Sequence, residues 1–206
     1  AINMVLDVVD LGLEYDSAQL ARNAANYDAN HKLALVGAAR WTNAASTPLA
    51  DMDAGKEAVR RSIGRYPNTL VLGPTSYGAL KRHAAVKDQF KYTGRDSITA
   101  EMLAAYLDLK KVVVGKAVFL AETALDTSPA SDIWGDDAIL AYVPEAGDNF
   151  QVPSFGYTYE LMGYPQVETP YFERKNSSWI YPTTTERRAY LTGSEGGFLF
   201  QNSGAV

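Results

Sequence analysis

The 206-residue sequence contains no cysteine and only two histidines, His31 and His83. Without cysteine the chain can form no disulfide framework, thiolate metal site or cysteine nucleophile. No apolar run approaches the roughly 18–20 residues of a membrane span, and the acidic opening at 1–13 lacks the basic start of a signal peptide. We therefore expect no membrane partner, no cofactor and no bound metal.

An excess of basic residues is also missing. Lys and Arg number 19 against 24 Asp and Glu, so the net charge is −5 at pH 7. A protein that grips nucleic acid needs a basic face to neutralise phosphates. The nearest candidate is the stretch 82–95, which contains Arg82, Lys87, Lys91 and Arg95 but also Asp88. We interpret it as a solvated helix face, with a nucleic-acid patch as the alternative.

Helical patterns concentrate in the first half of the chain. Polar residues ahead of apolar stripes of helical period predict four helices, which begin at Ser17, Asp53, Ser76 and Thr99. The first should run to about Asn26, and the second should end at Gly64, where a left-handed residue is wanted. The opening segment 3–13 is apolar with acidic interruptions, and it predicts a strand or a loop.

Strand patterns dominate the second half. The apolar run 69–72 lies between turn residues and predicts a short buried strand, and 111–120 and 138–143 are rich in β-formers. After Pro144, aromatic and polar residues alternate with the period of a half-buried strand. Helices before strands indicate an α+β fold, not the βαβ alternation of a nucleotide-binding sheet.

Motifs for catalysis are absent or weak. No serine has the Gly-x-Ser-x-Gly frame of a nucleophile elbow, and no phosphate-binding glycine loop occurs. Asp51 and Asp53 could hold a hard cation or serve a small carboxylate-dependent hydrolase. Asp136 and Asp137 follow a glycine in a turn, where adjacent acids are usually solvated. We predict that the protein is not an enzyme.

Aromatic residues are the more informative feature. Three tryptophans, Trp41, Trp134 and Trp179, lie in or beside loop-like sequence. They can be core anchors, or they can fill pockets on a neighbouring subunit, as buried aromatics often do at interfaces. The later Phe155 and Tyr157 fit an aromatic sheet face or a subunit contact. The residues alone thus favour a structural or interaction protein.

Several segments, taken in order, resemble the major capsid proteins of tailed bacteriophages and prophages. They span about 28 to 204 and comprise 35–37 with Trp41, 46–48 with Asp51, 64–73, His83, 91–92, 99–103, 112–117, 133–135 and 153–158. The resemblance implies the Hong Kong 97-type fold, with interleaved domains. The peripheral-type domain would comprise 1–66 and 145–185, and the axial-type domain would comprise 67–144 and 186–206. Relative to that family we expect the N-terminal arm and the extended loop to be missing.

The function that this resemblance implies is geometric. The chain would be a structural subunit of an icosahedral capsid that assembles into capsomers and a DNA-containing shell. Its partners would be other copies of itself, scaffold and portal proteins, and packaged DNA on the inner face, without sequence-specific binding. It would be located in the virion capsid and assemble in the bacterial host cytoplasm. An encapsulin-like nanocompartment shell protein and the carboxylate-dependent hydrolase are the alternatives.

Overall fold

The computed structural model describes residues 2–90, 98–121, 123–125, 127–144 and 153–206. Its centre is a five-stranded mixed sheet in the order β1-β13-β6-β2-β3. The strands are β1 (Lys32–Ala34), β13 (Gly197–Gln201), β6 (Ala138–Ala141), β2 (Thr69–Leu72) and β3 (Lys111–Val114). Strand β6 is antiparallel to both neighbours, with Leu140 beside Phe198 and Leu70. All four residues of β6 are buried, so this strand is central to the core.

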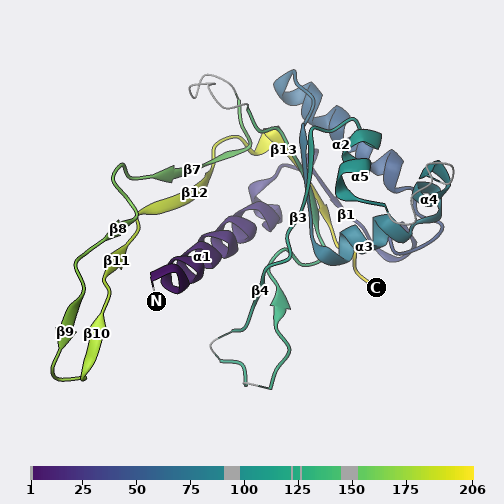
Figure 1. Ribbon diagram of the computed structural model, residues 1–206. Helices are drawn as coiled ribbons and strands as arrows, with labels where there is room; N and C mark the ends of the chain where they lie inside the picture. The colour runs from purple at the N-terminus through teal and green to yellow at the C-terminus, as the bar shows by residue number, and fades with distance from the viewer. Residues whose placement is uncertain (1, 91–97, 122, 126, 145–152) are drawn as a thin grey trace.

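Four helices cover one face of the sheet, on the right in Figure 1. They are α2 (Pro48–Ile63), α3 (Pro74–Arg82), α4 (Ala84–Phe90) and α5 (Ala100–Tyr106). The main core lies under α2 and α3, where Met52, Val59 and Leu80 join apolar side chains of the sheet. Helix α2 comes very close to the strands, because a Cβ on Gly55 would lie 2.8 Å from Cζ of Phe200.

The end of α1 (Ile2–Arg22) lies over the opposite face (Figure 1), and side chains from the loops pack there too. A second cluster there contains Tyr27, Ile139 and Leu199, with Trp134 and Phe155 packed against it. The sheet is therefore sandwiched between two unequal layers. Short 3-10 turns at Ala24–Asn26, Gly37–Ala39 and Ser194–Gly196 connect the elements.

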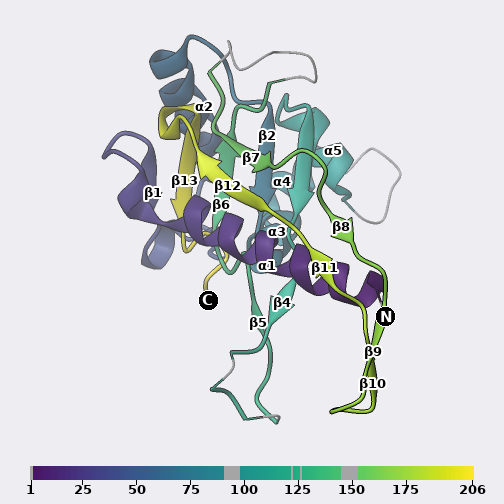
Figure 2. The same cartoon turned by 90° about the vertical axis from the view of Figure 1, so that its left-hand side faces the viewer.

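A long two-stranded ribbon leaves the sheet and runs beside α1 (Figures 1 and 2). It consists of three successive antiparallel pairs. These pairs are β7 (Gly156–Glu160) with β12 (Arg187–Leu191), β8 (Gln166–Val167) with β11 (Thr183–Thr184), and β9 (Tyr171–Glu173) with β10 (Ser178–Ile180). We call residues 161–186 of this ribbon the arm. A smaller hairpin pairs β4 (Val118–Phe119) with β5 (Ser131–Asp132).

Several predicted elements are confirmed. Strand β2 covers 69–72, and α5 follows Thr99, whose side chain accepts a hydrogen bond from the backbone N–H of Met102. Helix α2 ends at Gly64 in the left-handed conformation, at φ 72°. The alternating segment after Pro144 forms β7. Local signals sufficed where turn residues and apolar period agreed.

The predicted helix starts at Ser17 and Asp53 are wrong. Segment 3–13 is helical, so α1 runs through Ser17 without a break, and the Ser17 hydroxyl donates to the carbonyl of Leu13 at 2.7 Å. Helix α2 starts five residues before Asp53, at Pro48, whose fixed φ suits a first helical position. The predicted helix at Ser76 starts at Pro74, for the same reason.

Each predicted domain contains elements that pack in different parts of the structure. Within 1–66, α1 runs along the ribbon, whereas β1 pairs with β13 and α2 packs on the sheet. Within 186–206, β12 pairs with β7 and β13 lies in the sheet. The boundaries at 66, 144 and 185 stay predictions. In the stretch 82–95, Lys91 and Arg95 lie outside the described residues.

Candidate functional site

The carboxylates of Asp51 and Asp53 do not converge. Both lie on α2, and residues two apart on a helix point to different sides. The Asp51 carboxylate accepts a hydrogen bond from Nε1 of Trp41 at 3.0 Å, whereas Asp53 is largely exposed, 3.9 Å from Nζ of Lys56. No group of three or more potential metal ligands occurs among the residues that the structure describes. The paired-carboxylate arrangement that a hydrolase or cation site at these residues needs is therefore not formed.

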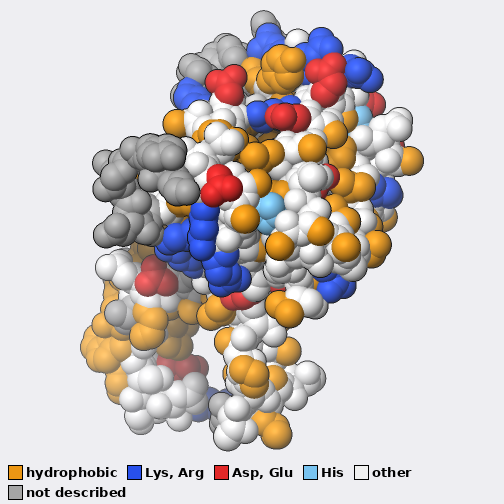
Figure 3. All heavy atoms as spheres, turned by 90° about the vertical axis from the view of Figure 1, so that its right-hand side faces the viewer, with side chains coloured by type: hydrophobic (Ala, Val, Ile, Leu, Met, Phe, Trp, Pro, Cys, Tyr) orange, Lys and Arg blue, Asp and Glu red, His pale blue; other side chains and the backbone are white. Residues whose placement is uncertain are grey.

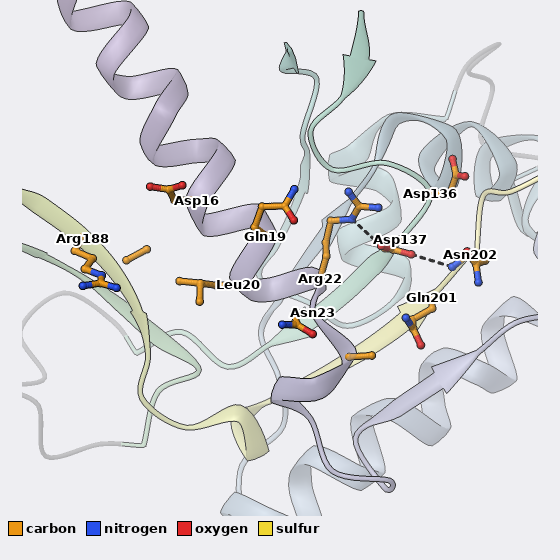
Figure 4. Close-up of a pocket in the computed structure, with 12 residues that line it drawn as sticks. Asp16, Gln19, Leu20, Arg22, Asn23, Asp136, Asp137, Arg188, Gln201 and Asn202 are labelled. Carbon is orange, nitrogen blue, oxygen red and sulfur yellow. Dashed lines mark hydrogen bonds and ion pairs between the residues drawn. The ribbon is translucent and has the colours of Figure 1, made fainter. Parts of the chain in front are cut away.

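A polar pocket of about 900 Å³ lies between α1, the β5–β6 connection, β12 and β13 (Figure 4). Asp137, expected to be solvated, is buried there, and its carboxylate accepts from Nε of Arg22 at 2.7 Å and from the backbone N–H of Asn202 at 2.9 Å. Asp136 accepts from the hydroxyl of Thr75 at 2.7 Å. The expectation that these acids are solvated is wrong for Asp137, because segments distant in sequence close over the turn, whereas Asp136 is half-buried.

Arg22 is the centre of this junction. Its guanidinium also donates to the carbonyl of Ile133 at 2.9 Å, so one side chain ties the end of α1 to two points of the connection before β6. Gly135 takes a positive φ of 52°, and a Cβ there would lie 2.4 Å from Nη2 of Arg22. A Cβ at this position would displace the guanidinium, and the positive φ also favours glycine. The charges of Arg22 and Asp137 neutralise each other. This ion pair therefore joins α1 to the connection before β6 and leaves neither side chain free for catalysis.

A Ser–His–Asp contact chain also occurs, at the turn before β1. Nδ1 of His31 lies 2.8 Å from the Asp28 carboxylate, and Nε2 lies 2.9 Å from Oγ of Ser62. The hydrogen bond from His31 holds the pKa of Asp28 below its usual range. Ser62, however, lies in the last turn of α2, where the negative end of the helix dipole would destabilise an oxyanion. The chain of contacts therefore fits a tie between the turn and α2, not a nucleophile.

The buried tyrosine of the second cluster reinforces the same region. The Tyr27 hydroxyl donates to the carbonyl of Ala21 at 2.6 Å. Burial, together with the charge of Asp137, raises the pKa of Tyr27 above its ordinary value. Tyr27 is therefore a neutral donor that fixes the end of α1.

The tryptophans predicted as core or interface anchors occupy three different environments. Trp41 is 1% exposed and lies against Phe200, with 5.4 Å between ring centroids. Trp134 is half-buried, and its Nε1 donates to the Glu14 carboxylate at 2.8 Å. Trp179 is 61% exposed on β10. The structure therefore does not bring the three together.

Phe155 and Tyr157 lie at the base of the ribbon. Phe155 is half-buried and stacks on Tyr27, with 6.0 Å between centroids. The ring of Tyr157 lies 6.4 Å from that of Tyr159, which in turn lies 6.4 Å from that of Tyr190. Aromatic contacts thus continue from the core onto the outer surface of the ribbon.

Exposed apolar side chains gather on the ribbon and on α1. Nine of the large hydrophobic residues that are exposed among those described lie between 156 and 191: Tyr159, Leu161, Met162, Val167, Tyr171, Phe172, Trp179, Tyr181 and Tyr190. Four more lie on α1: Met4, Val5, Val8 and Leu11. Apolar surface gathered in this way marks an interaction site. The sequence does not predict these four exposed residues of α1, because the segment 3–13 favours a strand or a loop and the helical pattern begins only at Ser17.

No helix within the described part of the chain has the length and apolar character to cross a bilayer. The exposed apolar residues of α1 alternate with the acids Asp7 and Asp10 on the same helix. A surface of this composition suits a protein partner, in which acids at the edge can stay hydrated.

Comparison with known proteins defines the family. The family described as "Phage major capsid protein E" matches residues 25–156. The major capsid protein of Burkholderia phage BcepMu is 33% identical over 203 residues, which cover 97% of this chain and 64% of that protein. The major capsid protein of Pseudomonas phage JBD67 is 26% identical over 161 residues, which cover 77% of this chain and 50% of that protein.

Solved structures agree with the family match. A phage-related protein from Bordetella bronchiseptica superposes with a TM-score of 0.93 at 40% identity, over 100% of this chain and 67% of that one. A prophage protein of Escherichia coli CFT073, proposed to be a capsid protein, superposes with a TM-score of 0.55 at 10% identity, over 94% of this chain and 63% of that one. The second likeness concerns the fold alone.

The matched family segment covers more than half of the chain, which belongs to the phage major capsid protein E family. The predicted resemblance to phage major capsid proteins is confirmed, and so is the α+β major-capsid fold of the Hong Kong 97 type. The chain spans 64% and 50% of the length of the two phage capsid proteins that it matches.

Proposed function

We propose that this chain is the structural subunit of a bacteriophage or prophage capsid and that it acts by self-association, without catalysis. The observation that carries the proposal is the match to the BcepMu major capsid protein along 97% of the chain. The exposed aromatic ribbon and the bare apolar face of α1 support it, because a monomer in water gains nothing by presenting them.

The proposed partners follow from the shell geometry. Copies of the chain make contacts that repeat around closed symmetry axes. Scaffold and portal proteins bind the assembling shell, and packaged DNA lies along its inner wall. The net charge of −5 supports an inner capsid wall that encloses DNA and binds it only weakly. Assembly takes place in the host cytoplasm, and the product is the virion capsid.

A two-part subunit is included in the proposal. The peripheral-type part comprises 1–66 and 145–185, and the axial-type part comprises 67–144 and 186–206. The contact of α1 with β11 supports the first part, and the position of β2, β3 and β6 in one sheet supports the second. Limited proteolysis that releases fragments ending near 66, 144 or 185 would support these boundaries, and cleavage confined to other positions would contradict them.

Light scattering of the purified chain over a wide concentration range, followed by negative-stain imaging, tests the proposal. We expect a mass that grows with concentration and particles with rotational symmetry or closed shells. A strict monomer at every concentration, with no particles in the images, would overturn it. Measurement in parallel at about 1 M salt separates apolar association, which persists, from contacts between exposed charges, which weaken.

A further inference from the structure

Helix α1 has two apolar stripes on opposite sides. Ile2, Leu6, Val9 and Leu13 follow helical spacing and are half-buried, on a helix that packs along β11 and β12. Met4, Val8 and Leu11 follow the same spacing about half a turn away, and Met4 and Val8 are each 65% exposed. A surface helix of a monomer normally has one apolar stripe, which faces its core, so a second exposed stripe marks a contact surface. The second stripe therefore lacks a cover within the described part of this chain.

The tip of the arm also has apolar side chains that are exposed and not covered by the described part of the chain. The β9–β10 hairpin has only two strands, and an isolated two-stranded hairpin is at best marginally stable in water. Phe172 and Trp179 face each other across it, with 5.6 Å between ring centroids, and both are about half exposed or more. This exposed aromatic pair is an anchor of the kind that dominates interface energies, and burying it against a partner would stabilise the hairpin.

The charges beside the two surfaces are opposite. Arg174 and Lys175 lie exposed in the turn between β9 and β10, and neither forms an ion pair with a described residue. Asp7 flanks the bare stripe of α1 and is likewise exposed and unpaired within the described residues. An arm tip placed on the stripe would bring a basic turn to an acidic helix edge. Complementary rim charges favour one register of docking over others.

The arm does not reach this surface on its own chain. The ribbon contacts α1 through β11 and β12, on the side of the half-buried stripe, and β9 and β10 lie beyond the N-terminal end of the helix (Figures 1 and 2). We propose that the Phe172–Trp179 tip of one copy docks on the Met4–Val8–Leu11 stripe of α1 in a second copy, with Arg174 and Lys175 facing Asp7. The contact joins two different surfaces, so it can propagate into rings.

This inference rests on the proposed self-association and specifies its contact. Because the chain contains no cysteine, introduced thiols are the only ones present. Gly12→Cys places a thiol beside the stripe, at a position with no heavy atom within 4 Å of an added Cβ, and Ser178→Cys places one beside Trp179. The two single variants are mixed and treated with a short bis-maleimide. Arg61→Cys, exposed on α2, replaces either partner as the matched control.

We expect a covalent dimer in the Gly12→Cys and Ser178→Cys mixture, at least about tenfold more abundant than in mixtures with Arg61→Cys. Mass spectrometry of the linked peptides then identifies a bond between residues 12 and 178. Cross-linking of Ser178→Cys only to itself would overturn the proposal in favour of arm–arm contact. If the unmodified chain assembles and the mixture gives no link above the control, this contact is wrong while the proposed function stands. A chain that stays monomeric would overturn both.

Side-chain exchange gives a second readout. Trp179→Ala should weaken association about tenfold or more, as expected for an aromatic anchor. Asp7→Lys should weaken it about fivefold at low salt, and combining it with Arg174→Glu and Lys175→Glu should recover most of that loss. If the combined variant associates more weakly than Asp7→Lys alone, the basic turn does not lie against Asp7. Circular dichroism of each variant checks that the fold is retained.

Discussion

Single polar residues in this protein join segments that are far apart in sequence. Arg22 binds Asp137 across 115 positions, and Trp134 donates to Glu14 across 120. Each contact secures α1 against the connection that leads into β6. Neither pairing has a local sequence signal, because the partners are neighbours only after the sheet has formed.

Removal of one member of the junction should cost more than removal of both. In Arg22→Ala the buried Asp137 carboxylate loses its counter-charge, so we expect the free energy of unfolding to fall by about 3 kcal/mol. Combining Arg22→Met with Asp137→Asn should recover a large part of that loss, because no uncompensated charge stays buried. Urea denaturation of the two variants measures the difference. Equal losses would contradict the role of Arg22 as a counter-charge.

Glu57 should give the protein part of its acid sensitivity. Hydrogen bonds from Arg60 and then Arg61 lower the pKa of Glu57 from 4.5 to about 2. A carboxyl whose pKa falls on folding stabilises the fold above its unfolded pKa, and this contribution is lost as pH falls from 4.5 towards 2. The Tm of Glu57→Gln should be lower than that of the parent at pH 7 and approach it near pH 2. Because the group is exposed, about 1 M salt should shrink the difference; a gap that does not change with pH would exclude this origin.

How far residue-level prediction succeeds depends on how local the cause is. Gly64 was predictable as a left-handed terminus because the helix signal and the glycine are adjacent. Asp53 was not, because Pro48 starts the helix earlier and leaves Asp53 on an exposed turn. The prediction that Asp137 is solvated was wrong for a third reason: its partners Arg22 and Asn202 come from opposite ends of the chain.

At the scale of elements, a helix or strand is easier to predict from the sequence when it has a single apolar pattern. Helix α5 and strand β2 each have one clear pattern and clear boundaries, and both were predicted. Only the C-terminal end of helix α1, from Ser17, was predicted. The earlier part was not, because its two apolar stripes together resemble a continuous apolar run with acids and lack the one-sided period of a surface helix. The ribbon was predicted as strands, but its pairing of Arg187 with Glu160 and of Trp179 with Phe172 could not be.

Two helical glycines should respond oppositely to a larger side chain. A Cβ on Gly55 in α2 would meet Phe200, Leu140 and Phe198 at 2.8, 3.1 and 3.2 Å, whereas one on Gly12 in α1 meets nothing within 4 Å. We expect Gly55→Val to lower the free energy of unfolding by about 3 kcal/mol through overpacking. Gly12→Ala should raise it by up to about 1 kcal/mol through helix propensity.

Thermal and urea unfolding of the two glycine variants, side by side, measure both effects. Gly55→Ala serves as an intermediate step, because its gain in helix propensity opposes a smaller steric cost. A Gly55→Val protein as stable as the parent would mean that α2 can move away from β13 and β6. That result would contradict the tight approach of helix and sheet.

At the scale of the whole molecule, the arrangement of layers could be recognised from the sequence only through its likeness to phage capsid proteins. Composition and period gave an α+β class, whereas the sheet order β1-β13-β6-β2-β3 brings the end of the chain between β1 and β6. Such an insertion has no local cause. The Bordetella bronchiseptica structure, at a TM-score of 0.93, has the same arrangement over the whole length of this chain.

The charge of the whole molecule predicts weak contact with DNA. Binding to a duplex requires Lys and Arg to replace condensed counterions, and each such contact adds to the salt dependence. This chain has a net charge of −5, and its helical face carries both acidic and basic side chains, with one small cluster of basic ones (Figure 3). We expect no saturable binding of a fluorescent 20-base-pair duplex, a length of about two helical turns, up to about 10 µM protein in about 150 mM salt.

Fluorescence anisotropy measures this binding, and two duplexes of unrelated sequence separate general from specific contact. Any binding that emerges near 50 mM salt should be equal for both duplexes and fall steeply with added salt, because phosphate contacts carry no sequence information. Arg82→Glu with Lys87→Glu removes the described basic residues of the stretch 82–95 and tests whether that stretch is responsible. Saturable, sequence-dependent binding at about 150 mM salt would contradict an inner capsid wall that binds DNA only weakly and without sequence specificity. It would also make the face of α3 and α4 a nucleic-acid interface.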